Sequence, residues 1–160
     1  MKIFKRARLG LSFVLLTFLI TGCLGNNYYP ETPVGHFRLA DQYMQAQDHQ
    51  DAITVYERIV LTYAGTVHAD QANFEIAQVY RGFIRDFDSA ANYYSRVLYE
   101  DPSSMWDSEA LYQMAGLYER DILDFSKAKL MYSRLMQEYP ESDHRNEALS
   151  AIHRIQGMGY

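Results

Sequence analysis

The sequence contains few of the residues that build covalent or metal-bound frameworks. Cys23 is the single cysteine among 160 residues, so the chain can form neither an internal disulfide nor a cysteine cluster for zinc. Its nine glycines never form the G-x-x-x-x-G-K pattern of a phosphate-binding loop. The longest uncharged, mostly apolar run, residues 9–20, has 12 residues, whereas a membrane-spanning helix needs about 20. These absences exclude a disulfide scaffold and a P-loop enzyme, and they argue against a spanning helix.

Basic charge is scarce as well. The 15 lysines and arginines are outnumbered by 20 aspartates and glutamates, which gives a net charge of −5. Nucleic-acid-binding proteins are usually basic, so no nucleic-acid partner is expected. The chain is nevertheless 48% hydrophobic and can bury a core, which rules out wholesale disorder. Tyrosine is unusually frequent, with 14 copies that any interpretation must place.

Catalytic and metal-binding arrangements are also missing. No nucleophile, base and orienting group occur in a recognisable pattern, so we expect no enzyme activity, no cofactor and no small-molecule substrate. The five histidines (36, 49, 68, 144 and 153) are scattered and include no i, i+4 pair. We interpret them as solvated surface side chains and expect no metal site.

The first 22 residues have the pattern of a secretory signal peptide. Residues 1–8 carry four basic side chains and no acidic one, residues 9–20 (LGLSFVLLTFLI) are apolar, and small residues follow. An alternative is a short membrane anchor that stays attached. Removal of residues 1–22 takes away four of the 15 bases and none of the 20 acids, so the remaining chain has a charge of −9.

Residues 20–23 (ITGC) resemble the lipobox of bacterial lipoproteins. The resemblance implies cleavage before Cys23 and modification of that cysteine with acyl chains such as palmitate. Position 24 holds leucine in place of the aspartate that implies inner-membrane retention, so the resemblance favours an outer-membrane lipoprotein facing the periplasm, if the source is Gram-negative. Residues 23–34 are interpreted as the lipidated cysteine and a tether, because this stretch has prolines and asparagines but no helical period.

The remainder of the chain is one unit repeated three times with a period of 38 residues. Five positions keep this interval, and each copy is preceded by an apolar residue, a small residue and a tyrosine. The first copy is one residue shorter between its two halves. The small and tyrosine positions, which we expect to form the repeat core, are Ala40, Tyr43, Ala52, Tyr56, Ala77, Tyr80, Ala90, Tyr94, Ala115, Tyr118, Ala128 and Tyr132.

Each unit is expected to form a helical hairpin. Apolar residues recur at helical spacing, and an aspartate (48, 86 or 124) stands where it can cap the second helix. Proline at 102 and 140 ends the second and third copies. The predicted helices cover residues 36–47, 49–63, 67–83, 86–100, 104–120, 124–138 and 142–156.

This pattern resembles the tetratricopeptide repeat (TPR). The resemblance implies an all-α, right-handed superhelix of three hairpins over residues 35–65, 66–102 and 103–140, with a capping helix and tail over 141–160. Two departures are the longer period and the bulky Ile59, Val97 and Leu135, which occupy a position where the family has alanine.

In the TPR family the first helix of each hairpin lines a concave groove that binds protein partners. The groove positions are, by this resemblance, Phe37, Asp41, Phe74, Gln78, Arg81, Tyr112, Glu119 and Arg120. One column is aromatic in all three copies (37, 74 and 112). These rings are either exposed peptide anchors or packed against the adjacent helix, and the sequence leaves both options open.

Taken together, these features predict a non-catalytic, membrane-anchored scaffold that docks protein partners in the cell envelope. The chain resembles the BamD-like lipoproteins of the β-barrel assembly machine, although these have about five repeats, and this implies a role in outer-membrane protein assembly. Alternatives are a pilotin-like lipoprotein for secretin or type IV pilus assembly, or an accessory factor of peptidoglycan turnover.

Overall fold

The structure is a computed structural model that describes residues 31–100 and 105–160. The predicted signal peptide, Cys23 and most of the predicted tether lie outside these residues. Within the described ranges every regular element is helical. The helices are α1 (Pro33–Gln45), α2 (His49–Thr62), α3 (Val67–Val79) with η1 (Tyr80–Ile84), α4 (Phe87–Glu100), α5 (Asp107–Leu117) with η2 (Tyr118–Ile122), α6 (Phe125–Glu138) and α7 (Arg145–Gly157).

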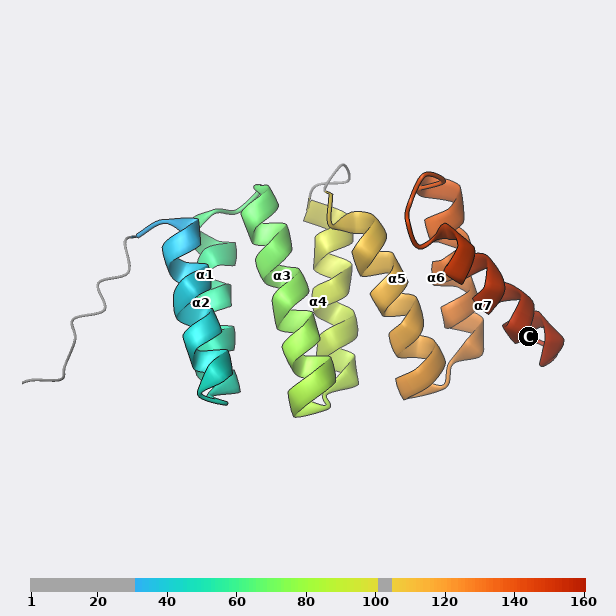
Figure 1. Cartoon of the computed structure of the whole chain (residues 1–160), viewed down its shortest axis with the longest axis horizontal. Coiled ribbons are helices and arrows are strands. Elements are labelled where there is room, and N and C mark those ends of the chain that lie inside the picture. Colours follow the sequence, from blue (N-terminus) through green and yellow to red (C-terminus); the bar gives the residue numbers. More distant parts are fainter. Residues whose placement is uncertain (1–30, 101–104) are drawn as a thin grey trace, which may run out of the picture.

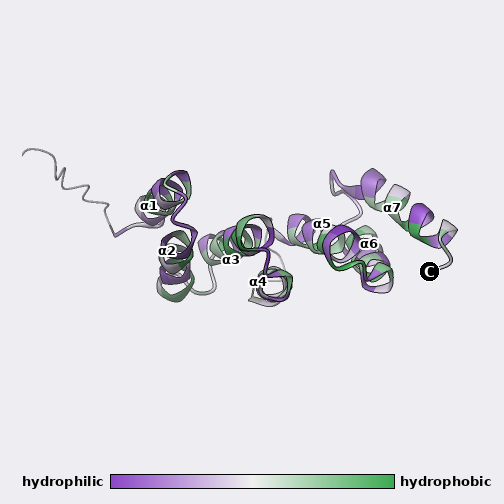
Figure 2. Cartoon of the chain, turned by 90° about the horizontal axis from the view of Figure 1, so that it is seen from below, coloured by the Kyte–Doolittle hydropathy of each residue, from purple (hydrophilic) through white to green (hydrophobic). Residues whose placement is uncertain are grey.

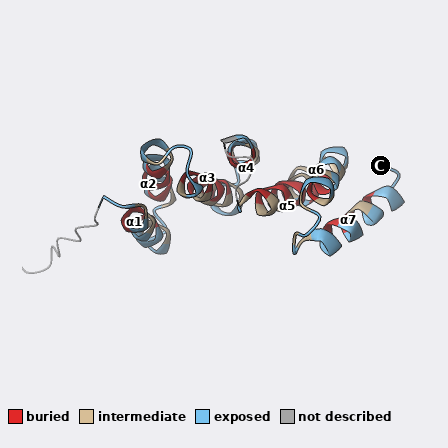
Figure 3. Cartoon of the chain, turned by 90° about the horizontal axis from the view of Figure 1, so that it is seen from above, coloured by how far each residue is buried: buried red, intermediate tan, exposed pale blue. Residues whose placement is uncertain are grey.

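The helices form three antiparallel hairpins that stack side by side, with α7 at the end (Figure 1). Each helix packs against the helices that precede and follow it in the chain. Seen from above, α2, α4 and α6 form one layer, and α1, α3, α5 and α7 form the other (Figure 3). In that view α1 and α7 project beyond α3 and α5, so the first-helix layer is curved.

The small repeat positions allow this close stacking. All six alanines of the repeat core, and also Ala148 and Ala151 on α7, are buried with at most 2% exposure. The three tyrosines of the second helices, at positions 56, 94 and 132, are also buried, whereas Tyr43, Tyr80 and Tyr118 of the first helices are half-buried at the edge of the core. Apolar residues face the inside of each hairpin and polar residues cover the outside (Figure 2).

The structure shows where the extra residue of the second and third copies goes. In these copies the first helix ends in a π-helical turn, η1 or η2, which holds one more residue than an α-helical turn. In every copy the backbone N–H of the capping aspartate donates to the carbonyl of the repeat tyrosine, at 2.8–3.1 Å. These pairs are Asp48–Tyr43, Asp86–Tyr80 and Asp124–Tyr118. The π turn therefore lets hairpins of two lengths close in the same way.

Each hairpin turns through a residue in the left-handed backbone region. Gln47, Arg85 and Leu123 have φ of 64–65° and occupy the position directly before the capping aspartate. None is glycine, although this conformation costs other residues about 1–2 kcal/mol. The sequence did not reveal this position, because the usual glycine signal is absent.

The capping aspartates act in two of the three copies. Asp86 accepts from the backbone N–H of Ser89 at 3.0 Å, and Asp124 accepts from that of Lys127 at 3.0 Å. The pKa of the Asp86 carboxyl is lowered chiefly by a further hydrogen bond from the Ser89 hydroxyl and then by this backbone bond. The pKa of Asp124 is lowered chiefly by the Lys127 backbone bond. Asp48 makes no such side-chain bond, so the predicted cap is wrong for the first copy.

Candidate partner-binding groove

A cavity of about 360 Å³ opens between α5 and α7, with α6 beneath it. Its lining residues come from α5, η2, α6 and α7: Tyr112, Arg120, Tyr132, Asn146, Glu147, Ser150, Ala151 and Arg154. Two of the residues predicted for the groove, Tyr112 and Arg120, therefore lie at one cavity. The contribution of α7 was not foreseen, because sequence reasoning treated this helix only as a cap.

Glu119 was predicted as a groove residue, but its carboxylate is bonded within the protein. The side chain is 7% exposed. Arg154 donates to its Oε1 from Nε at 3.0 Å, and the Tyr132 hydroxyl donates to its Oε2 at 3.0 Å. Burial, reinforced by the charge of Glu119, raises the pKa of Tyr132, which therefore remains a protonated donor. A buried carboxylate needs such partners, so Glu119 is held in the structure and is not available to a ligand.

Arg120, the next residue, is exposed and differs from Glu119 in having no ion pair among the described residues. Its guanidinium lies over Gly116, one helical turn earlier. A Cβ atom added to Gly116 would be 2.9 Å from Cζ of Arg120. The missing side chain at position 116 therefore provides the space in which this guanidinium lies.

Arg81 joins neighbouring hairpins, and Gln78 joins the two helices of its own hairpin. The Nε of Arg81 donates to Oδ2 of Asp121 at 2.8 Å, and both side chains are largely buried. A second guanidinium nitrogen, Nη1, donates to the carbonyl of Gln113 at 3.1 Å. Gln78 accepts from the Tyr94 hydroxyl at 3.0 Å. Both predicted groove residues therefore fix the position of helices, and their polar groups already have partners.

At the other end of the layer the groove is acidic. Asp41 on α1 is exposed, and Phe37 is half-buried with its ring 6.0 Å from that of Tyr56. Burial raises the pKa of Glu75 on α3, and the nearby charge of Asp41 raises it further. Glu75 was missed because its helical position was not assigned to the groove.

The interpretation of Phe74 as an exposed anchor is wrong. The ring is only 6% exposed and packs against Trp106 at 5.1 Å and Tyr94 at 5.7 Å between centroids. Of the two options that the sequence left open, packing applies here. The aromatic column is therefore not continuous on the surface: Phe37 and Tyr112 are half-buried, and Phe74 is core.

The interpretation of the histidines as solvated residues is wrong for His36 and His144, which take part in packing, whereas His153 is exposed. His36 is 3% exposed, and its Nε2 lies 3.2 Å from a carboxylate oxygen of Glu31. The imidazole of His144 stacks on the ring of Tyr112, with centroids 4.1 Å apart and planes 4° apart, and its Nε2 contacts the carboxylate of Glu109. This stack positions Tyr112 at the cavity and joins α5 to the start of α7.

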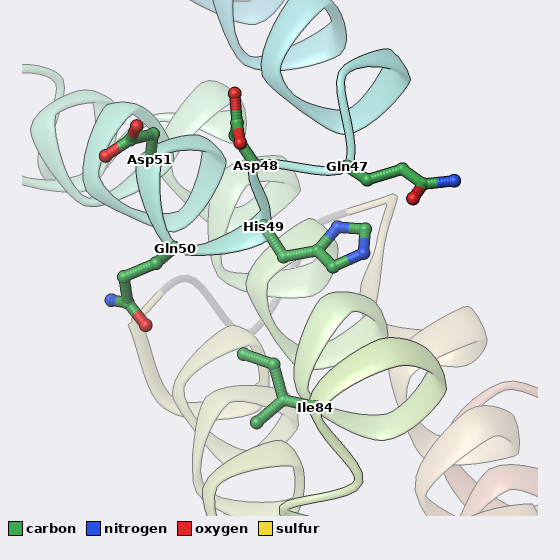
Figure 4. A pocket seen from close by; sticks show the side chains of 6 residues that line it. All are labelled: Gln47, Asp48, His49, Gln50, Asp51 and Ile84. Carbon is green, nitrogen blue, oxygen red and sulfur yellow. The ribbon is translucent and has the colours of Figure 1, made fainter.

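A second cavity, of about 440 Å³, lies where the turn between α1 and α2 meets η1 (Figure 4). Residues 47–51 and Ile84 line it, and the imidazole of His49 packs against the ring of Phe83, with centroids 4.3 Å apart and planes tilted by 32°. The carboxylates of Asp48 and Asp51 point away from Ile84 (Figure 4), so they do not converge on a ligand. In the described ranges no three His, Cys, Asp or Glu residues come together as a metal site would require. None of the described helices has the length and apolar character of a membrane span.

Comparison with known proteins bears on the fold. A family model described as tetratricopeptide repeat matches residues 36–66 and 109–142, which contain the first and third hairpins. No curated protein matches the chain. Forty-one chains of solved structures match it, among them the crystal structure of MamA. The match to MamA has a TM-score of 0.61 and 18% sequence identity, and it covers 81% of this chain and 70% of the MamA chain. The tetratricopeptide repeat model thus matches these two segments, and the chain folds as a TPR-like superhelix.

Proposed function

We propose that this chain is a lipid-anchored scaffold that docks protein partners on the periplasmic side of the outer membrane. The observation that carries the proposal is the stacked first-helix layer, which leaves an open cavity beside Arg120, a residue without an ion pair in the described part of the chain. Such rigid, hollow surfaces formed by repeats are suited to binding protein segments. The lipobox-like residues 20–23 support the anchor, and the resemblance to BamD-like lipoproteins supports a role in outer-membrane protein assembly.

The anchor is tested by replacing Cys23 with serine. We expect the variant to remain uncleaved and without acyl chains by mass spectrometry, and to be lost from outer-membrane fractions. Normal processing and acylation of the variant would contradict the lipobox. The Arg58→Gln variant, altered on the exposed side of α2, is the control and should be processed like the unmodified chain.

The docking function is tested by crosslinking in whole cells followed by purification of the chain from membranes. A crosslinked β-barrel assembly complex supports the proposed role, whereas a secretin ring indicates the pilotin-like alternative. Crosslinks that disappear when the cavity between α5 and α7 is altered locate the contact. The absence of any crosslinked envelope protein contradicts the scaffold function.

A further inference from the structure

Arg120 makes no ion pair with any residue that the structure describes, unlike Arg81 and Arg154 on the same layer. Arg81 is paired with Asp121, and Arg154 with Glu119. These pairs hold successive first helices together, from η1 to η2 and from η2 to α7. Arg120 takes no part in them, so its guanidinium is a free donor at the edge of a cavity.

The surroundings of Arg120 hold the guanidinium toward the cavity. The guanidinium occupies the space that Gly116 provides because it has no side chain. The charge of Arg120 acts on the buried hydroxyl of Tyr132, a residue that lines the same cavity. Asn146 and Ser150 lie one turn apart on α7 and form the opposite wall. A ligand group that enters here lies between the planar, permanently charged guanidinium of Arg120 on one side and neutral polar side chains on the other.

We propose that the cavity between α5 and α7 holds the carboxylate of an aspartate or glutamate side chain within an extended segment of the partner protein, and that Arg120 binds it. This inference rests on the proposed docking function and specifies the chemistry of the docked segment. A guanidinium binds a carboxylate through two parallel hydrogen bonds.

Of the two positive charges that line the cavity, only that of Arg120 is not paired with a carboxylate among the described residues. Arg154 is neutralised by Glu119, and Glu147 adds a negative charge to the lining, so a doubly charged phosphate would lack compensation. The chain without residues 1–22 carries a charge of −9, which disfavours a segment with several acids. The expected ligand is therefore one acidic residue among neutral ones, and its binding should weaken as salt is added.

The test is a selection of random peptides displayed on phage as N-terminal fusions, against the full chain in detergent. Displayed segments of this kind have no free C-terminus, so an enriched acid must be a side chain. Four proteins are compared: the unmodified chain, Arg120→Gln, Gly116→Ala and Arg58→Gln. Arg120→Gln removes the charge, while Gly116→Ala keeps it but fills the space that the guanidinium occupies. Gly116→Ala also favours the helix, so loss of folding does not explain a negative result.

We expect the unmodified chain and Arg58→Gln to enrich peptides with one acid at a fixed position, and the other two variants to lose this preference. A synthetic, amidated copy of an enriched peptide should bind about tenfold more weakly when its acid is replaced by asparagine or glutamine.

Three outcomes would overturn the inference. Enrichment of peptides without an acidic position, or of acidic peptides equally by Arg120→Gln, refutes the role of Arg120 and leaves the docking function intact. Binding that requires a free C-terminal carboxylate refutes the side-chain ligand. If none of the four proteins enriches any peptide, the groove is not a docking site for protein segments. That result would contradict the docking function and, with it, the carboxylate ligand of Arg120.

Discussion

At the scale of single residues, tyrosine hydroxyls supply much of the polar bonding between helices. Tyr93 donates to Glu57 and Tyr139 donates to Asp107, each at 2.8 Å, across 36 and 32 residues of sequence. Burial, together with these carboxylates, raises the pKa of both tyrosines to about 12, so the hydroxyls remain donors at neutral pH. The abundance of tyrosine thus serves two purposes, because the rings fill the core and the hydroxyls join helices, between hairpins for Tyr93 and within the third hairpin for Tyr139.

The burial of Phe74 predicts a loss of stability when its ring is removed. Phe74→Ala should lower the free energy of unfolding by about 3–5 kcal/mol, because it leaves a cavity between Trp106 and Tyr94. The matched control is Phe83→Ala, since that ring is 57% exposed. Chemical denaturation measures both, and similar losses for the two variants would show that Phe74 is not core.

The cap at Asp124 predicts a pH-dependent contribution to stability. Its pKa is lowered, chiefly by the hydrogen bond from the Lys127 backbone. A lowered carboxyl pKa gives stability that is present above the unfolded-state value of about 3.9 and is lost as the pH falls through the folded-state value. Asp124→Ala should therefore destabilise the protein at pH 7 and have little effect at the acidic end of the titration.

Asp48→Ala is the control for this prediction, because Asp48 occupies the same repeat position without the capping bond. Thermal unfolding measured from pH 7 downward compares the two variants. An equal effect of both substitutions, or an effect of Asp124→Ala that does not change with pH, would show that the cap is not responsible.

At the scale of elements, the turn inside each hairpin carries a conformational cost that glycine would relieve. Leu123 has φ of 64°, and its side chain is 64% exposed, so replacement by glycine loses little packing. Leu123→Gly should raise the free energy of unfolding by up to about 1 kcal/mol, because relief of backbone strain outweighs the added freedom of the unfolded chain.

Leu130→Gly is the matched control for the turn. Leu130 is similarly exposed, at 60%, but lies inside α6. Glycine in a helix interior costs about 1 kcal/mol relative to alanine, so this variant should be less stable than the unmodified chain. Urea denaturation gives both changes. If both variants are destabilised, the positive φ of Leu123 carries no cost that glycine can remove.

The helices could be predicted from the sequence, because apolar periodicity is a local property. The structure has a helix in each of the seven predicted ranges, displaced by a few residues at the ends. The π turns could not be predicted: the extra residue was visible in the repeat spacing, but the spacing does not say whether it enters a helix or a loop.

The burial of Phe74 depends on Trp106 from the next hairpin, and the pairing of Glu119 depends on Arg154, 35 residues away. Contacts of this kind follow from how hairpins stack and not from the pattern within one repeat.

At the scale of the whole molecule, the hairpins form a one-dimensional stack in which each unit is supported by its neighbours. The buried side of α7, with Ala148, Ala151 and Ile155, covers the end of the third hairpin. In such an array stability is the sum of the units and of the interfaces between neighbours, and a terminal unit with a polar outer side is needed. The cavity between α5 and α7 depends on this last interface, so the stability of α7 also determines whether the groove is complete.

This arrangement predicts that a substitution that destabilises α7 lowers the stability of the neighbouring hairpin most and that of the distant hairpin least. Ile155→Ala, at a fully buried position, should cost about 2–5 kcal/mol and detach α7. Amide hydrogen exchange should then lose protection first in α7, next in α5 and α6, and least in α1 and α2, because coupling passes only between adjacent units. Leu149→Ala, on the same helix but 37% exposed, is the control and should change protection little. A uniform loss of protection across all helices would instead mean that the chain unfolds as one cooperative unit, and that α7 supports the distant α1–α2 hairpin as strongly as it supports α6.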